Sequence, residues 1–171
     1  MANIAIDFDG TIVTHEFPRI GKILPGVVET MQVLRENDHK IFLWTMRGYH
    51  PDHKRCLEEA VAWLESRDIL PNFINRSTSG FSTTSPKQHA NLYIDDAACG
   101  CPLCAFPNSS GELVLCADWL QISNILRELN YINAEQHKRI YNGIISTYNE
   151  QNLTYKPCYW PVGATGLPTP R

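Results

Sequence analysis

The stretch that most constrains the fold is Asn3–Thr11, NIAIDFDGT. Its apolar beginning is long enough for a buried strand. Asp7 and Asp9 are two positions apart, so they point to the same face of an extended chain. Burying two carboxylates on an apolar strand is unfavourable unless they bind a cation or take part in a reaction on a phosphate group. Gly10 lets the backbone turn sharply, and Thr11 adds a hydroxyl beyond the turn. The stretch therefore predicts a strand that ends in a reactive site.

Two further apolar runs also end in polar residues. The run 40–46 carries Thr45 and is followed by Arg47, and the run 91–94 is followed by Asp95 and Asp96. Continuous apolar runs suit strands buried on both faces of a parallel sheet, and such sheets bind ligands at the carboxyl ends of their strands. Adjacent carboxylates repel each other unless a cation shares them. Taken alone, however, these two residues are better explained without a function, Thr45 as a β-branched strand residue and Arg47 as a solvated cap.

Together these pieces resemble the four motifs of the haloacid dehalogenase (HAD) superfamily, which is mostly phosphatases and phosphotransferases. The order is DxDGT at the first strand, Thr45 at the second, Lys87 upstream of the third, and then the acidic pair at 95–96. The resemblance covers residues 3–96. It implies an α/β chain with a three-layer Rossmann-like HAD fold, a mostly parallel sheet with helices on both faces, and no large cap domain.

The resemblance also implies a role for each motif position. Asp7 would be the nucleophile and Asp9 the general acid/base, with Thr45 and Lys87 holding the phosphoryl group. A Mg²⁺ ion would be held by Asp7, Asp9, Asp95 and Asp96, with the backbone carbonyl as the Asp9 ligand. A cation such as Lys87 is needed to offset the repulsion between a nucleophilic carboxylate and phosphoryl oxygens. We add Thr11 and Arg47 as further substrate ligands, although Arg47 lies outside the family's core motif.

The predicted function is Mg²⁺-dependent phosphomonoester hydrolysis through an aspartyl-phosphate. Two alternatives stay open, namely a phosphotransferase with an acceptor other than water and a non-catalytic HAD scaffold that binds a partner. A dehalogenase would not need a second carboxylate, so the presence of Asp9 argues against that class of enzyme. The dinucleotide-binding pattern G-x-G-x-x-G and the Walker A pattern are both absent from the sequence.

Length and charge limit the remaining classes. The 171 residues suit one domain with a sizeable core. A net charge of −3 argues against a protein that binds nucleic acids by neutralising phosphates. No apolar run reaches the length of a membrane span, and the first strand begins too early to leave room for a signal peptide, so we expect a cytoplasmic protein. The expected partner is a phosphorylated substrate.

Periodicity and composition predict the remaining elements. Apolar residues at helical spacing predict helices over 26–37, 51–67, 118–129 and 134–149, and 73–75 is a short strand candidate. The loop 12–25 is a candidate flap over the site. We expect a hydrolase domain over 1–150 and a C-terminal tail over 151–171.

Six cysteines raise the question of a structural metal. Cys99, Cys101, Cys104 and Cys116 could hold Zn²⁺, but their spacing is not the usual C-x2-C pair, so free thiols are the preferred interpretation. His50, His53 and Cys56 are a weaker metal candidate, because no fourth ligand is near them in the sequence.

Overall fold

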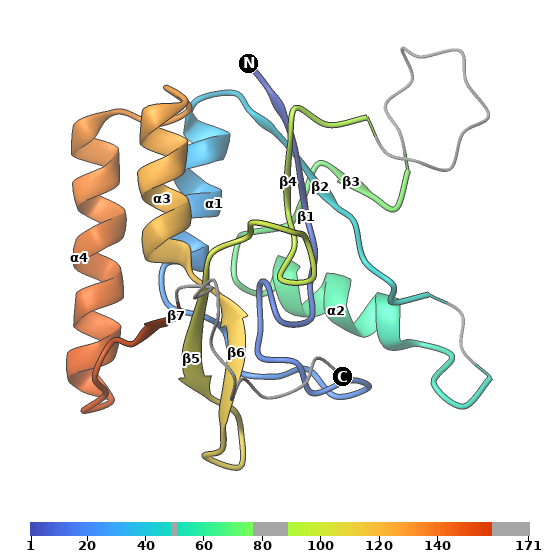
Figure 1. Cartoon of the computed structure of the whole chain (residues 1–171). Coiled ribbons are helices and arrows are strands. Elements are labelled where there is room, and N and C mark those ends of the chain that lie inside the picture. The colour runs from blue at the N-terminus through green and yellow to red at the C-terminus, as the bar shows by residue number, and fades with distance from the viewer. Residues whose placement is uncertain (49–50, 77–88, 159–171) are drawn as a thin grey trace.

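A four-stranded sheet lies at the centre of the computed structural model, which describes residues 1–48, 51–76 and 89–158 (Figure 1). The strand order is β3-β2-β1-β4, and all pairings in this sheet are parallel. The sheet consists of β1 (Asn3–Ile6), β2 (Lys40–Leu43), β3 (Phe73–Ile74) and β4 (Leu92–Ile94). The prediction of an α/β chain whose first strand lies between the strands near 40 and 91 is confirmed.

Strand β1 is covered on both faces. Ile4, Ala5 and Ile6 are all at most 2% exposed, and successive residues of a strand point to opposite faces. Ile6 is in register with Leu43 on one side and with Ile94 on the other. The carboxyl ends of β1, β2 and β4 therefore lie level at one edge of the sheet, so the residues that follow these strands emerge together.

Four helices flank this sheet. In Figure 1, α1 (Val27–Glu36), α3 (Trp119–Glu128) and α4 (Ala134–Glu150) lie together on one side of the strands, and α2 (Cys56–Glu65) lies on the other. Trp63 of α2 packs edge to face on Phe8, with ring centroids 5.8 Å apart. Asp118 caps α3, because its side chain accepts the backbone N–H groups of residues 120 and 121. Helix α2 is shorter than the predicted 51–67, since a turn precedes it in which the Cys56 N–H donates to the His53 carbonyl.

A second, antiparallel sheet was not predicted from the sequence. It has the order β6-β5-β7 and consists of β5 (Leu103–Pro107), β6 (Leu113–Ala117) and β7 (Pro157–Cys158). The turn between β5 and β6 contains Gly111, whose φ of 86° is the left-handed conformation that glycine adopts readily. The Ala117 N–H donates to the Gly10 carbonyl at 2.8 Å, which joins this sheet to the loop after β1.

The chain after α4 is anchored as far as it is described. Strand β7 pairs with β5, and the Tyr155 hydroxyl donates a 2.6 Å hydrogen bond to the buried Asp118 carboxylate. The prediction of a tail over 151–171 is thus only partly tested, since residues 159–171 lie outside the described part of the chain. Among the described residues, no helix combines the length and the apolar character that crossing a membrane requires.

Candidate functional site

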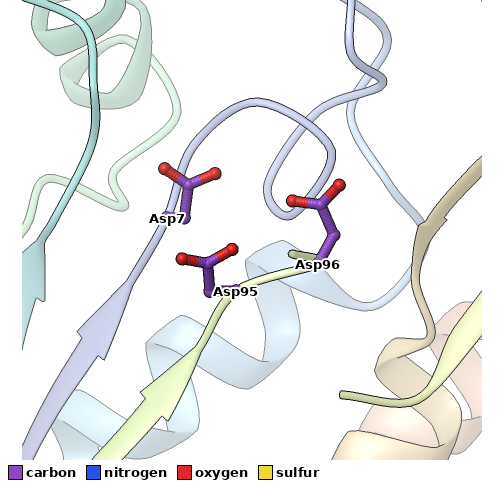
Figure 2. A group of neighbouring side chains, drawn as sticks. All are labelled: Asp7, Asp95 and Asp96. Atoms are coloured by element: carbon purple, nitrogen blue, oxygen red, sulfur yellow. The ribbon is translucent and has the colours of Figure 1, made fainter. Parts of the chain in front are cut away.

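Three carboxylates gather where β1 and β4 end. Asp7 directly follows β1, and Asp95 and Asp96 directly follow β4. One oxygen of each side chain lies within 4.8 Å of the others, and all three residues are half-buried. Figure 2 shows Asp7 and Asp95 side by side at the two strand ends, with Asp96 beside them. The parallel pairing of β1 and β4 places them there and continues past Ile6, since the Asp7 N–H donates to the Ile94 carbonyl at 2.9 Å.

The turn after β1 is shaped to fit against the acidic pair. Gly10 has a φ of 86°, and a Cβ atom at this position would collide with the Asp96 carboxylate. The Thr11 hydroxyl accepts the Asp96 N–H at 3.0 Å and lies 3.3 Å from its carboxylate oxygen Oδ1, to which it donates. Thr11 is fully buried. In the structure, Thr11 therefore holds Asp96 in place, whereas the sequence predicts Thr11 as a substrate ligand.

Burial and mutual repulsion make the cluster unfavourable without a cation. Burial raises the pKa of Asp7 to about 8, and the charges of Asp95, Asp96 and Asp9 act in the same direction. Burial and the adjacent Asp95 also raise the pKa of Asp96, while His15 and the Thr11 hydroxyl oppose that rise. A positive charge among the three carboxylates would remove both the repulsion and part of the desolvation penalty.

The donor set fits a hard divalent cation. Mg²⁺ prefers oxygen ligands at about 2.0–2.1 Å, so two of its ligand oxygens are about 3–4 Å apart. In the cluster, the ligand oxygens lie within 4.8 Å of one another, which is close to this range. Asp7, Asp95 and Asp96 are thus the residues that would hold such an ion. The Asp9 carboxylate is not a member of this cluster.

Asp9 is instead paired with Arg47. The guanidinium donates from Nε to Oδ2 and from Nη2 to Oδ1, both at 2.7 Å, which is a bidentate ion pair. The Arg47 side chain is 1% exposed and that of Asp9 is 11% exposed. The sequence predicts Arg47 as a substrate ligand, or otherwise as a solvated cap, but the structure places it in the interior as the partner of Asp9.

The loop 12–25 is held from two sides. Arg47 donates to the carbonyls of Pro18 and Arg19, at 3.1 and 2.8 Å. On the other side, Glu16 accepts hydrogen bonds from the backbone N–H and the hydroxyl of Ser109, in the turn between β5 and β6. The predicted flap is therefore a braced loop in this structure. His15, whose charge acts to lower the pKa of Asp96, was not predicted as a neighbour of the site, and only its position shortly after the acidic motif could have indicated it.

The predicted phosphate ligands are placed in part. Thr45 lies two residues beyond β2, at the same sheet edge as Asp7, and is half-buried. Its hydroxyl oxygen accepts the Arg47 N–H at 3.1 Å, and its own N–H donates to the Asn75 side chain at 2.9 Å. Because the Thr45 hydroxyl acts as the acceptor in this bond, its O–H can still donate to a further acceptor. Lys87 lies outside the described residues, and so does His50.

All six cysteines are free thiols in the structure. Cys104 on β5 is directly opposite Cys116 on β6, and both are buried. Burial raises the pKa of the Cys101 thiol to about 11 and that of Cys116 to about 12. Among the described His, Cys, Asp and Glu side chains, the acidic triad is the group that gathers closely enough for a shared ion. The prediction of free thiols without zinc still needs a metal analysis.

The fold and the acidic triad define an α/β protein with a carboxylate cluster at the carboxyl edge of a parallel sheet. Neither a protein family model nor a curated protein matches this chain. A solved structure of a conserved protein from Bacteroides thetaiotaomicron does match, with a TM-score of 0.56 and 32% sequence identity over 75% of this chain and 91% of that one. The chain belongs to the same family as that conserved protein.

Proposed function

We propose that this protein is a Mg²⁺-dependent phosphomonoester hydrolase with the three-layer Rossmann-like fold of the HAD superfamily. The observation that carries the proposal is the meeting of Asp7, Asp95 and Asp96 at one sheet edge. They come from the first and last of the four sequence motifs that resemble the superfamily. The parallel sheet, with Thr45 at the same edge, supports the same proposal.

The proposed chemistry assigns one task to each side chain. Asp7 attacks phosphorus and forms an aspartyl-phosphate, which splits one difficult displacement into two easier steps. Asp9 protonates the leaving oxygen and then takes a proton from the attacking water. Thr45, and Lys87 by resemblance, orient the phosphoryl oxygens. Asp7, Asp95 and Asp96 would hold Mg²⁺, which would supply positive charge to offset that of the phosphoryl oxygens.

The decisive experiment is a phosphatase assay on the purified chain with and without Mg²⁺. A panel of phosphomonoesters should reveal activity that EDTA abolishes and that Mg²⁺ restores. Asp7→Asn should lose turnover completely and should form no aspartyl-phosphate, because the nucleophile is gone. Asp38→Asn is the matched control, since Asp38 is an exposed carboxylate in the turn after α1. Near-normal Mg²⁺-dependent activity in Asp7→Asn would refute the assignment of the nucleophile.

A further inference from the structure

Arg47 uses every N–H of its guanidinium inside the protein. An arginine side chain has five N–H donors. Two of them hold the two carboxylate oxygens of Asp9, and the others reach the carbonyls of Pro18, Arg19 and, at 3.4 Å, Cys56. The guanidinium carbon also lies 4.8 Å from the centre of the Phe8 ring. Arg47 therefore has no donor left for a ligand, although it lies two residues from Thr45 at the candidate site.

The groups that Arg47 joins come from separate parts of the chain. Asp9 lies in the turn after β1, whereas Pro18 and Arg19 lie in the braced loop 12–25. Cys56 is the first residue of α2. A single buried side chain thus fixes the orientation of the Asp9 carboxylate relative to the loop and to the helix. This geometry needs the planar fork of arginine, because a lysine ammonium cannot donate in parallel to both carboxylate oxygens.

We propose that Arg47 is the positioning residue for Asp9. The inference rests on the proposed function, in which Asp9 transfers protons to and from the reacting oxygen. Such transfer requires the carboxylate within about 2.6–3.2 Å of that oxygen. Without Arg47, the Asp9 side chain is free to rotate about its own bonds, and the proton-transfer steps become slower. Attack by Asp7 does not depend on the orientation of Asp9, so phosphorylation of Asp7 by an activated aryl phosphate persists.

A double-mutant cycle tests this role. Arg47→Lys keeps the charge and should lower kcat by roughly 10–100-fold, because small misplacements of a reacting group have effects of this size. The KM should change little, and a burst of aryl product should precede the slow turnover. In an Asp9→Asn background, Arg47→Lys should cause no further loss of kcat, because the group that it positions is already absent. The matched control is Arg139→Lys, whose guanidinium pairs with Glu36 through two hydrogen bonds between α4 and α1. It should leave kcat unchanged.

Several outcomes would overturn the inference. An unchanged kcat in Arg47→Lys would do so, and so would the same fold-loss of kcat in the wild-type and Asp9→Asn backgrounds, which would indicate a general structural effect.

If Arg47→Lys does not fold, Asp9→Glu provides the test in the presence of the native arginine. Its longer side chain retains a carboxylate but cannot keep both 2.7 Å contacts in place, so wild-type kcat in Asp9→Glu would contradict a need for positioning. No phosphomonoester hydrolysis by the wild type would overturn the proposed function and this inference with it. A wild-type kcat in the Arg47 variants would overturn the inference alone.

Discussion

Protonation of Asp7 governs how the metal-free protein responds to pH. Its pKa is raised from 3.8 to about 8, mainly by burial. Between these two values the folded state binds more protons than the unfolded state, so the free energy of unfolding falls as the pH rises from about 4 to 8. We therefore expect the melting temperature in EDTA to decrease over this range. Asp7→Asn should flatten the decrease, because the titrating group is gone.

The metal should reverse this trend. Binding of Mg²⁺ requires the deprotonated carboxylate, so the stabilisation that Mg²⁺ adds should grow as the pH rises towards 8. Melting temperatures at several pH values, with EDTA and with excess Mg²⁺, measure both effects. Asp38→Asn should leave both curves unchanged. Equal stabilisation by Mg²⁺ at pH 5 and pH 8 would contradict the placement of Asp7 at the ion.

The acidic residues of the site were predictable from the sequence, whereas the environment of Arg47 was not. An apolar run directly precedes Asp7, and another directly precedes the pair Asp95 and Asp96. Parallel strands bring such positions to one edge of the sheet. Arg47 follows an apolar run in the same way. Its burial depends on carbonyl groups in the loop 12–25 and at the start of α2, which no local pattern reveals.

At the level of elements, helical periodicity predicted the four described helices, and continuous apolar runs predicted the three longer strands of the parallel sheet. Strand β2 ends at Leu43 rather than near 46. The Trp44 N–H still donates to the Ile6 carbonyl of β1, but the Thr45 N–H donates to the Asn75 side chain instead of to the backbone of a neighbouring strand. The antiparallel sheet was not predicted from the sequence. Two short apolar runs around the turn 108–112 were the available signal for the hairpin of β5 and β6. The partner of β7 could not be predicted from so short a segment.

A buried hydrogen bond adds to the strand pairing that anchors the segment after α4. The Tyr155 hydroxyl donates to Asp118, whose carboxylate is 1% exposed and also caps α3. Tyr155→Phe should lower the free energy of unfolding by about 1–3 kcal/mol, because it leaves a buried acceptor without its donor. Urea denaturation measures the change. Tyr141→Phe on α4, where the side chain is exposed, should stay within about 0.5 kcal/mol of the wild type. A similarly small effect of Tyr155→Phe would show that the anchor contributes little.

For the whole molecule, the access to the site determines which substrates fit. In the described part of the chain, the loop 12–25 is braced by Arg47 and Ser109, and the chain between β2 and β4 adds α2 and β3 rather than a separate domain. An enzyme without a lid relies on its substrate to exclude water. We expect a bulky phosphorylated substrate, or low selectivity among small ones.

A comparison of kcat/KM across substrate sizes tests this expectation. Phosphorylated peptides and oligonucleotide ends represent the bulky class, and sugar and glycerol phosphates represent the small one. A single small phosphate turned over near the diffusional ceiling, about 10⁸ M⁻¹s⁻¹, would contradict the expectation. Comparable low efficiencies across all small phosphates would agree with a site that no described segment covers as a lid.

The strand order β3-β2-β1-β4 also determines when the parallel sheet becomes complete during synthesis. Strand β1 leaves the ribosome first and can pair early with β2, but its other edge stays open until β4 has been made. Closing this long loop is entropically unfavourable, and such distant pairings form slowly. A nascent or truncated chain that lacks β4 therefore exposes an apolar strand edge that invites aggregation. It also lacks Asp95 and Asp96, so affinity for a divalent cation should report the completion of the parallel sheet.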